Sequence, residues 1–139
     1  MGASHSLCLP RPALRITSAH MIGILETGVP PNGLAQCWGD YPAMVCNLLG
    51  PGISGQSFDV RAGPLPDPAA CSAWVITGSS SGVYDGDPWI ADLIGFVQRV
   101  PADIPLIGIC FGHQLMAEAF GGEVVKSPKG GGLGMHRYE

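Results

Sequence analysis

The stretch of residues 105–122 permits few backbone arrangements. It reads PLIGICFGHQLMAEAFGG: a short apolar run, Cys110 between Gly108 and Gly112, and a helical pattern. This order is typical of a nucleophile elbow, where the nucleophile occupies a strained turn between a strand and a helix and neighbouring glycines leave no Cβ to clash. The sequence therefore predicts a strand, a sharp turn at Cys110 and a helix.

The same turn predicts a reactive thiol. A cysteine at a helix N-terminus is favoured as the thiolate by the partial positive charge of the unpaired amides. These amides can also stabilise an oxyanion, and the N–H of Phe111, the residue after the nucleophile, is the expected first donor. The alternative is a buried structural cysteine, since free cysteines are among the most buried residues. The two glycines and the strand–turn–helix pattern favour a nucleophile.

Short apolar runs alternate with amphipathic segments along the rest of the chain. The runs predict strands at residues 21–25, 53–61, 73–77 and 105–109, and a further short strand at 123–126. A loop is expected at 28–33, which contains paired prolines and two glycines. This alternation predicts an α/β fold with a mostly parallel sheet and helices on both faces.

Two further helices have recognisable start and stop signals. Asp40 has the position of an N-cap and Gly50 that of a stop, which predicts a helix between them. Asp87 followed by Pro88 predicts the start of a second helix, and Pro101 marks its end. In such folds ligands bind beyond the carboxyl ends of the strands, so the loop of residues 78–82 and the elbow are expected to share one cleft.

Length and charge exclude several classes of protein. The chain has 139 residues, which suits one domain. Its net charge is −4 and it has no basic cluster, so the electrostatic signature of a nucleic-acid-binding protein is missing. Residues 41–58 form the longest uncharged stretch, but prolines and glycines interrupt it, so no membrane-spanning helix is expected. A small-molecule substrate is the better expectation.

The cysteines and the N-terminal residues indicate the cellular compartment of the protein. Five scattered cysteines without a C-x-x-C pair indicate reduced thiols in a cytoplasmic protein. No metal or other cofactor is expected, because capping and loop polarity account for Asp85 and Asp87. Residues 1–20 lack a signal-peptide pattern and are expected to be a disordered extension. Translation from Met21 is a hypothesis that mass spectrometry of the native N-terminus would test.

Four segments together resemble one known family. The elbow sequence Gly-Ile-Cys-Phe-Gly-His-Gln at 108–114 is similar to the nucleophile motif of class I glutamine amidotransferases, and residues 74–85 resemble their oxyanion loop. Residues 22–28 and 134–139 resemble the stand-alone, GMP-synthase-like subgroup. The resemblance covers residues 21–139.

The resemblance implies a flavodoxin-like, doubly wound fold and a thiol that attacks the side-chain amide of glutamine or a related γ-glutamyl compound, giving a glutamyl-thioester. Cys110 would be the nucleophile, and the N–H groups of Ser79 and Phe111 would bind the oxyanion. Gln114 would line the glutamine pocket. Many members have a second glycine after the residue that matches Gly78, whereas this chain has Ser79, which keeps the N–H and adds a Cβ. A synthetase or other ammonia-accepting enzyme is a possible partner.

The resemblance also implies a catalytic His-x-Glu pair well beyond the elbow, which this sequence lacks. His113 is assigned to the surface of the elbow helix, and His136, although followed by Glu139, matches a strand upstream of the true histidine. We therefore expect residues 21–139 to be the N-terminal part of the domain, with an incomplete sheet and no activity of their own.

Two alternatives stay open. The chain could be a truncated, non-catalytic fragment or interaction module, which would expose apolar sheet surface. It could instead be a cysteine hydrolase of the related intracellular protease and chaperone superfamily, which also places a cysteine on an elbow. The sequence after Cys110 and the Thr-Gly-Ser loop at residues 77–79 favour the amidotransferase branch.

Overall fold

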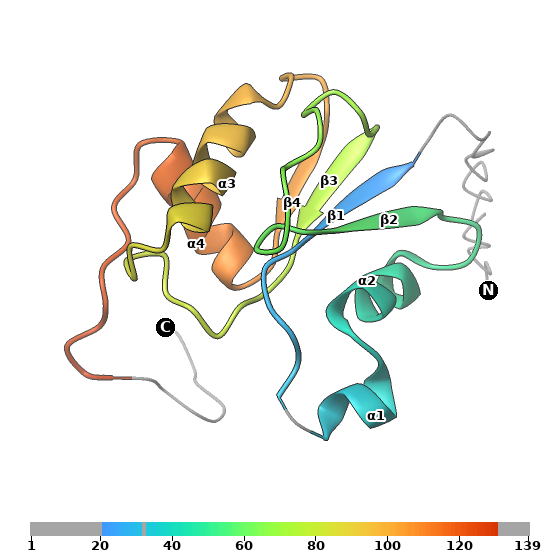
Figure 1. The fold of residues 1–139 in the computed structure, drawn as a ribbon, viewed down its shortest axis with the longest axis horizontal. Helices are drawn as coiled ribbons and strands as arrows, with labels where there is room; N and C mark the ends of the chain where they lie inside the picture. The colour runs from blue at the N-terminus through green and yellow to red at the C-terminus, as the bar shows by residue number, and fades with distance from the viewer. Residues whose placement is uncertain (1–20, 32, 131–139) are drawn as a thin grey trace, which may run out of the picture.

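Four parallel strands form one sheet in a computed structural model that describes residues 21–31 and 33–130. The strands are β1 (Ile22–Glu26), β2 (Gly55–Asp59), β3 (Ala73–Ile76) and β4 (Leu106–Gly108). They lie in the order β2-β1-β3-β4, with every neighbouring pair parallel (Figure 1). This order is the first part of the flavodoxin-like arrangement, so the predicted fold class is confirmed.

Four helices accompany the sheet within the described residues. They are α1 (Leu34–Trp38), α2 (Tyr41–Leu49), α3 (Pro88–Arg99) and α4 (Phe111–Ala119). The carboxylate of Asp40 accepts a hydrogen bond from the Ala43 N–H at 2.8 Å, as expected of an N-cap. Asp87 occupies the N-cap position of α3, but only its backbone carbonyl takes part, accepting from the Ile90 N–H at 3.0 Å.

Helices cover both faces of the sheet, as the alternation of side chains along the strands requires. Ile24 and Val75 point to one face and pack against Val45 of α2. Trp74 and Ile76 point to the other face, in the larger core formed with α3 and α4. Figure 1 shows α3 and α4 on one side of the sheet and α2 on the other. The prediction of helices on both faces is therefore confirmed.

The structure differs from the sequence-based expectation in two places. The short helix α1 was not predicted, because its five residues show no periodic apolar pattern and none of them is buried. The strand predicted at 123–126 is wrong: the segment is not part of the sheet, and Val125 is 69% exposed. The Val124 N–H donates instead to the carboxylate of Glu118, at 2.5 Å.

Strand β4 lies at the edge of the sheet and exposes apolar side chains. Ile107 is 48% exposed, and Ile109, just beyond the strand, is 37% exposed.

Among the described residues, none of the helices is both long and apolar enough to cross a bilayer. The described residues begin at Met21, the alternative start. The predicted extension at 1–20 and the segment 134–139 lie outside them.

Candidate active site

Cys110 occupies the turn between β4 and α4. Its backbone has φ +52° and ψ −103°, and within residues 21–31 and 33–130 no other non-glycine residue has a positive φ. Such a conformation costs about 1–3 kcal/mol and persists only where the surroundings impose it. The predicted strand, strained turn and helix are all present at the expected positions.

The two flanking glycines are required by close backbone contacts. A Cβ on Gly108 would lie 2.5 Å from the carbonyl carbon and oxygen of Gly112. A Cβ on Gly112 would lie 2.6 Å from the carbonyl oxygen of Ile76, at the end of β3. The first turn of α4 therefore rests directly on the ends of β3 and β4, and this contact fixes the direction in which Cys110 is presented.

The cysteines differ in accessibility. Cys110 is exposed, so the alternative of a buried structural cysteine is wrong at this position. Cys71 is buried in the core under α3, and this burial raises the pKa of its thiol above the ordinary range. Cys37 on α1 is also exposed and provides an internal reference for thiol reactivity.

The loop after β3 lies beside the thiol. A Cβ on Gly78 would approach the Cβ of Cys110 to 3.7 Å, so the backbone of this loop and the elbow are in contact range. The Ser79 hydroxyl donates to the carbonyl oxygen of Thr27 at 2.8 Å and accepts from the Ser81 N–H at 3.1 Å. The Ser79 side chain thus holds the loop in place.

A buried pair of threonines supports this loop and was missed by the sequence analysis. The Thr27 N–H donates to Oγ1 of Thr77 at 3.0 Å, and Thr27 Oγ1 lies 3.0 Å from the carbonyl oxygens of both Thr77 and Gly78. Both threonines are at most 1% exposed. The signal was visible in the sequence, because β1 and β3 are each followed by Thr-Gly.

We expect Thr27→Val to reduce the free energy of unfolding by about 1–3 kcal/mol, because it keeps the side-chain shape and leaves buried polar groups without a partner. Urea unfolding would measure the change. Thr27→Ser, which retains the hydroxyl, is the control and should lose less. A valine variant as stable as the serine variant would contradict this role of the hydroxyl network.

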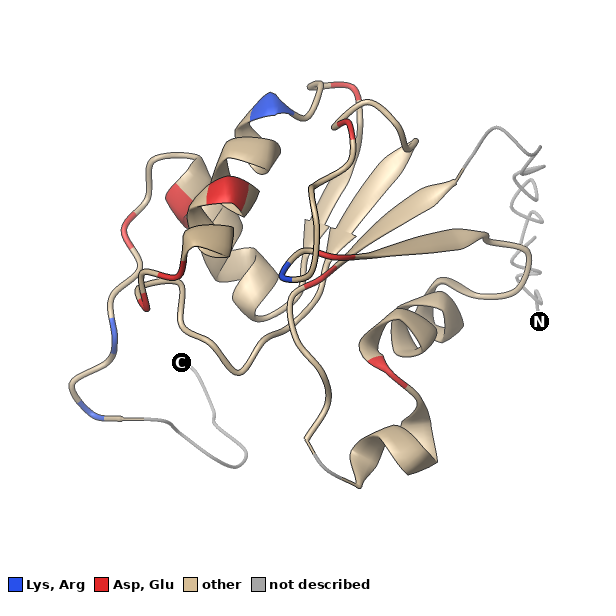
Figure 2. Cartoon of the chain, viewed as in Figure 1, with Lys and Arg blue, Asp and Glu red and all other residues tan. Residues whose placement is uncertain are grey.

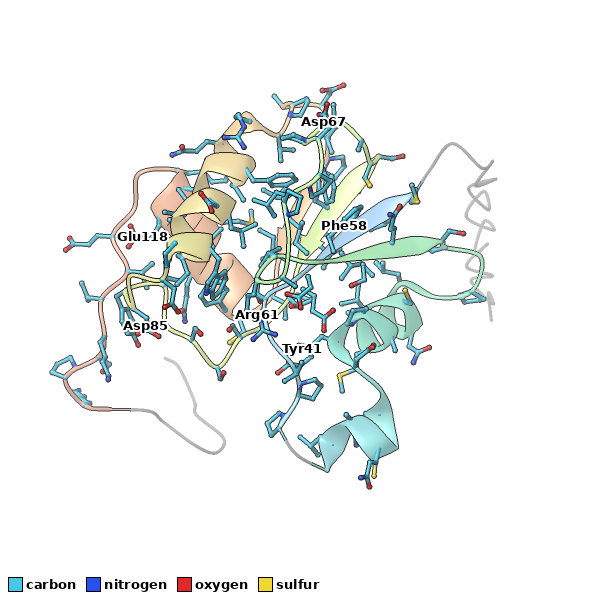
Figure 3. The ribbon with its side chains drawn as sticks, viewed as in Figure 1. Tyr41, Phe58, Arg61, Asp67, Asp85 and Glu118 are labelled. Carbon is cyan, nitrogen blue, oxygen red and sulfur yellow. The ribbon has the colours of Figure 1, made fainter. Side chains whose placement is uncertain are left out.

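A cavity of about 290 Å³ opens beside Cys110, at the carboxyl ends of β3 and β4. It lies between α2 and the elbow, and Figure 3 shows Tyr41 at the start of α2, near the ends of the strands. The lining residues come from α2, the loop after β3 and the elbow: Tyr41, Met44, Val45, Leu48, Thr77, Gly78, Ser79, Ile109 and Cys110. The structure thus brings Gly78, Ser79 and Cys110 together around one cavity.

Two other expected site residues lie on α4. The Phe111 side chain is buried against Trp89, with ring centroids 5.4 Å apart, and its N–H is the first of the helix. Gln114 does not line the Cys110 cavity, but a second cavity of about 290 Å³ that includes Tyr84 and Lys126. His113 is exposed on α4, which confirms its place on the helix surface.

Of the remaining candidates, Asp85 lies within the described residues and has a structural contact. The Asp85 carboxylate accepts from the Gly82 N–H at 2.6 Å, as expected of a loop residue. No group of three or more potential metal ligands occurs among residues 21–31 and 33–130. His5, His20, His136 and Glu139 lie outside the described residues.

Comparisons with known proteins match this chain to one family. The family model described as "Glutamine amidotransferase class-I" matches residues 71–137. The chain is 32% identical over 126 residues to a glutamine amidotransferase-like protein of Schizosaccharomyces pombe, covering 78% of this chain and 51% of that protein. It is 36% identical over 98 residues to gamma-glutamyl peptidase 4 of Arabidopsis thaliana, covering 67% and 39% respectively.

A solved structure is also similar. The crystal structure of glutamine amido transferase from Methylobacillus flagellatus superimposes with a TM-score of 0.56 at 30% sequence identity. The similarity covers 78% of this chain and 41% of that chain. The chain therefore spans about half, or less, of the length of the proteins it matches.

Proposed function

Since this chain belongs to the class I glutamine amidotransferase family, we propose that its Cys110 thiol attacks the side-chain amide of glutamine or of a related γ-glutamyl compound. The observation that carries the proposal is the exposed Cys110, held at φ +52° beside a cavity. The Sγ–C bond forms and the C–N bond breaks, so that ammonia or an amine leaves with the proton of the thiol. Water then cleaves the thioester and regenerates the thiol.

The oxyanion formed during the attack needs donors that are already in place. We assign this role to the backbone N–H groups of Ser79 and Phe111, which flank Cys110 from the loop after β3 and from the first turn of α4. The hydrogen bonds of the Ser79 hydroxyl support this assignment, because they fix the loop that carries one donor. Gln114, one helical turn beyond the nucleophile, is assigned to bind the amino-acid part of the substrate.

A base is also needed to take the thiol proton and deliver it to the leaving amine. None of the nine residues that line the Cys110 cavity is a histidine or a carboxylate. We therefore propose that the 139-residue chain presents a reactive thiol but has little hydrolytic activity of its own. Ammonia release from glutamine, compared between the chain and its Cys110→Ala variant, measures that activity.

Labelling with 6-chloro-5-oxo-L-norleucine, a chloromethyl ketone analogue of glutamine, tests the proposed nucleophile directly. We expect Cys110 to be alkylated at least about ten times faster than Cys37, because binding of the amino-acid part places the electrophile beside Cys110. Peptide mapping by mass spectrometry gives both rates in one sample, since both thiols are exposed. The D-enantiomer is the control for recognition. Equal rates at the two cysteines would refute the proposed function.

A further inference from the structure

The cavity beside Cys110 is walled mainly by carbon atoms. Four of its lining residues, Tyr41, Met44, Val45 and Leu48, come from α2, and Ile109 closes the side toward β4. None of the nine lining residues carries a charge. The whole of α2 is without charged residues, and Figure 2 shows an acidic residue only at its start. The cavity therefore offers an apolar environment next to the thiol.

The serine and threonine hydroxyl groups at this cavity already have hydrogen-bond partners. Thr77 Oγ1 accepts from the Thr27 N–H, and Ser79 Oγ both donates to the Thr27 carbonyl and accepts from the Ser81 N–H. The α-ammonium and α-carboxylate of glutamine would thus find no charged partner and no unengaged serine or threonine hydroxyl here. Because burying an unpaired charge is strongly unfavourable, the amino-acid part of a substrate does not belong in this cavity.

Polar groups that suit the carboxylate of such an amino-acid part lie on the other side of the elbow. The second cavity is lined by Gln114 and Lys126, which offer an amide and an ammonium group to a carboxylate. Gln114 belongs to α4, which packs on the opposite face of the sheet from α2. Figure 2 shows basic residues in the segment beyond α4. A substrate that spans Cys110 can therefore place its charged end toward α4 and its other end toward α2.

We propose that the cavity between α2 and the elbow receives an apolar substituent on the nitrogen of the scissile amide, so that the preferred substrates are γ-glutamyl amides of apolar amines. This inference rests on the proposed function and names its substrate class. The attack is the one described above: the Sγ–C bond forms, the C–N bond breaks, and the apolar amine leaves with the thiol proton. Water then releases glutamate.

The size of the cavity fits one such group. About 290 Å³ lies near the lower limit of the pockets that hold whole small ligands. A dry apolar cavity of about 150 Å³ is enough to bind benzene. The cavity can thus take a phenyl or branched aliphatic group together with the atoms that connect it to the amide.

Two alkylating reagents that differ only in such a group test the inference without requiring turnover. The alkylation rates of Cys110 and Cys37 are measured in the same sample for N-benzyl-2-chloroacetamide and for 2-chloroacetamide. We expect the ratio of benzyl to unsubstituted rate to be roughly tenfold higher at Cys110 than at Cys37, since burying the ring removes apolar surface from water. The exposed Cys37 does not line the cavity and supplies the intrinsic reactivity ratio.

Two matched variants of α2 test whether the higher rate ratio at Cys110 arises from the cavity. Leu48→Asp puts a carboxylate at the cavity wall, and because Leu48 is 78% exposed the fold should accept it. Asn47→Asp adds the same charge to an exposed, non-lining neighbour on α2. We expect Leu48→Asp to bring the ratio at Cys110 down to that at Cys37, and Asn47→Asp to leave it unchanged.

The outcomes separate this inference from the proposed function. Equal ratios at the two cysteines, or a Cys110 ratio that falls equally in both variants, would overturn the apolar subsite while leaving the nucleophile assignment intact. Failure of the glutamine chloromethyl ketone to select Cys110 would instead refute the proposed function. A high ratio that is lost only in Leu48→Asp supports the subsite.

Discussion

Gly112→Ala is expected to lower the free energy of unfolding by about 3 kcal/mol, at the upper end of what one added methyl group costs in a well-packed site. The new Cβ would lie 2.6 Å from the carbonyl oxygen and 2.8 Å from the Cβ of Ile76. Ile76 is fully buried in β3, so it has no room to move away. The start of α4 must shift instead, which separates it from the sheet. Urea unfolding measures the loss.

Gly63→Ala is the matched control for this variant. It is the same substitution in a loop where a Cβ would meet no atom within 4 Å and where φ is not in the left-handed region. It should change the free energy of unfolding by no more than about 0.5 kcal/mol, as is usual for surface substitutions. If both variants lost the same stability, the close contact of Gly112 with β3 would not be the cause.

The same substitution should also impair the thiol. A shift of α4 moves the Phe111 N–H and the backbone of Cys110 together, because both belong to the turn that Gly112 allows. We therefore expect Gly112→Ala to label more slowly with the glutamine chloromethyl ketone than Gly63→Ala does, at a temperature where both are folded. Stability and reactivity share one cause at this position.

The elbow could be predicted from the sequence because its determinants are local. Cys110, Gly108 and Gly112 lie within five residues, and the strand and helix that give the motif its meaning adjoin them directly. Helices α2 and α3 could be predicted equally well, since their start and stop signals lie next to the helical pattern.

The hydroxyl network was not predicted, although β1 and β3 are each followed by Thr-Gly, because the contact between the two threonines depends on strand pairing. Thr27 and Thr77 are 50 residues apart, and they meet only because β1 and β3 are neighbours in register. The strand expected at 123–126 is wrong for a related reason. Its two valines favour extended chain, but a strand also needs a neighbour, which no local pattern reveals. The apolar cavity likewise follows from the packing of α2 against distant residues.

Gln114 lies close to Cys110 in sequence but lines a different cavity. The family resemblance implied that Gln114 lines the glutamine pocket, and its backbone N–H does donate to the Cys110 carbonyl at 3.2 Å. The elbow nevertheless presents Cys110 to the α2 side, while Gln114 lines the cavity on the α4 side. The spacing in the sequence shows that the two residues are near each other. It does not show that the strained turn at Cys110 directs the two side chains to different cavities.

Cys110→Gly is expected to abolish labelling by the glutamine chloromethyl ketone at the elbow while making the fold more stable. Glycine adopts φ +52° without the steric penalty of a Cβ, so the substitution releases about 1–3 kcal/mol of strain. The greater freedom of glycine in the unfolded chain offsets about 0.4–1 kcal/mol of this gain. The net expectation is a stabilisation of roughly 1 kcal/mol, measured by urea unfolding.

Cys110→Ala separates the two effects. It removes the sulfur and so loses labelling as completely as the glycine variant, but its Cβ keeps the strained backbone. We expect it to remain close to wild type in stability and below Cys110→Gly. Should the alanine variant be as stable as the glycine variant, the turn would store no strain. If Cys110→Gly is more stable than Cys110→Ala, the wild-type chain carries a destabilising backbone conformation at position 110 that a glycine would relieve. A glycine has no thiol, so the need to present a nucleophilic side chain is the physical reason to keep a cysteine there.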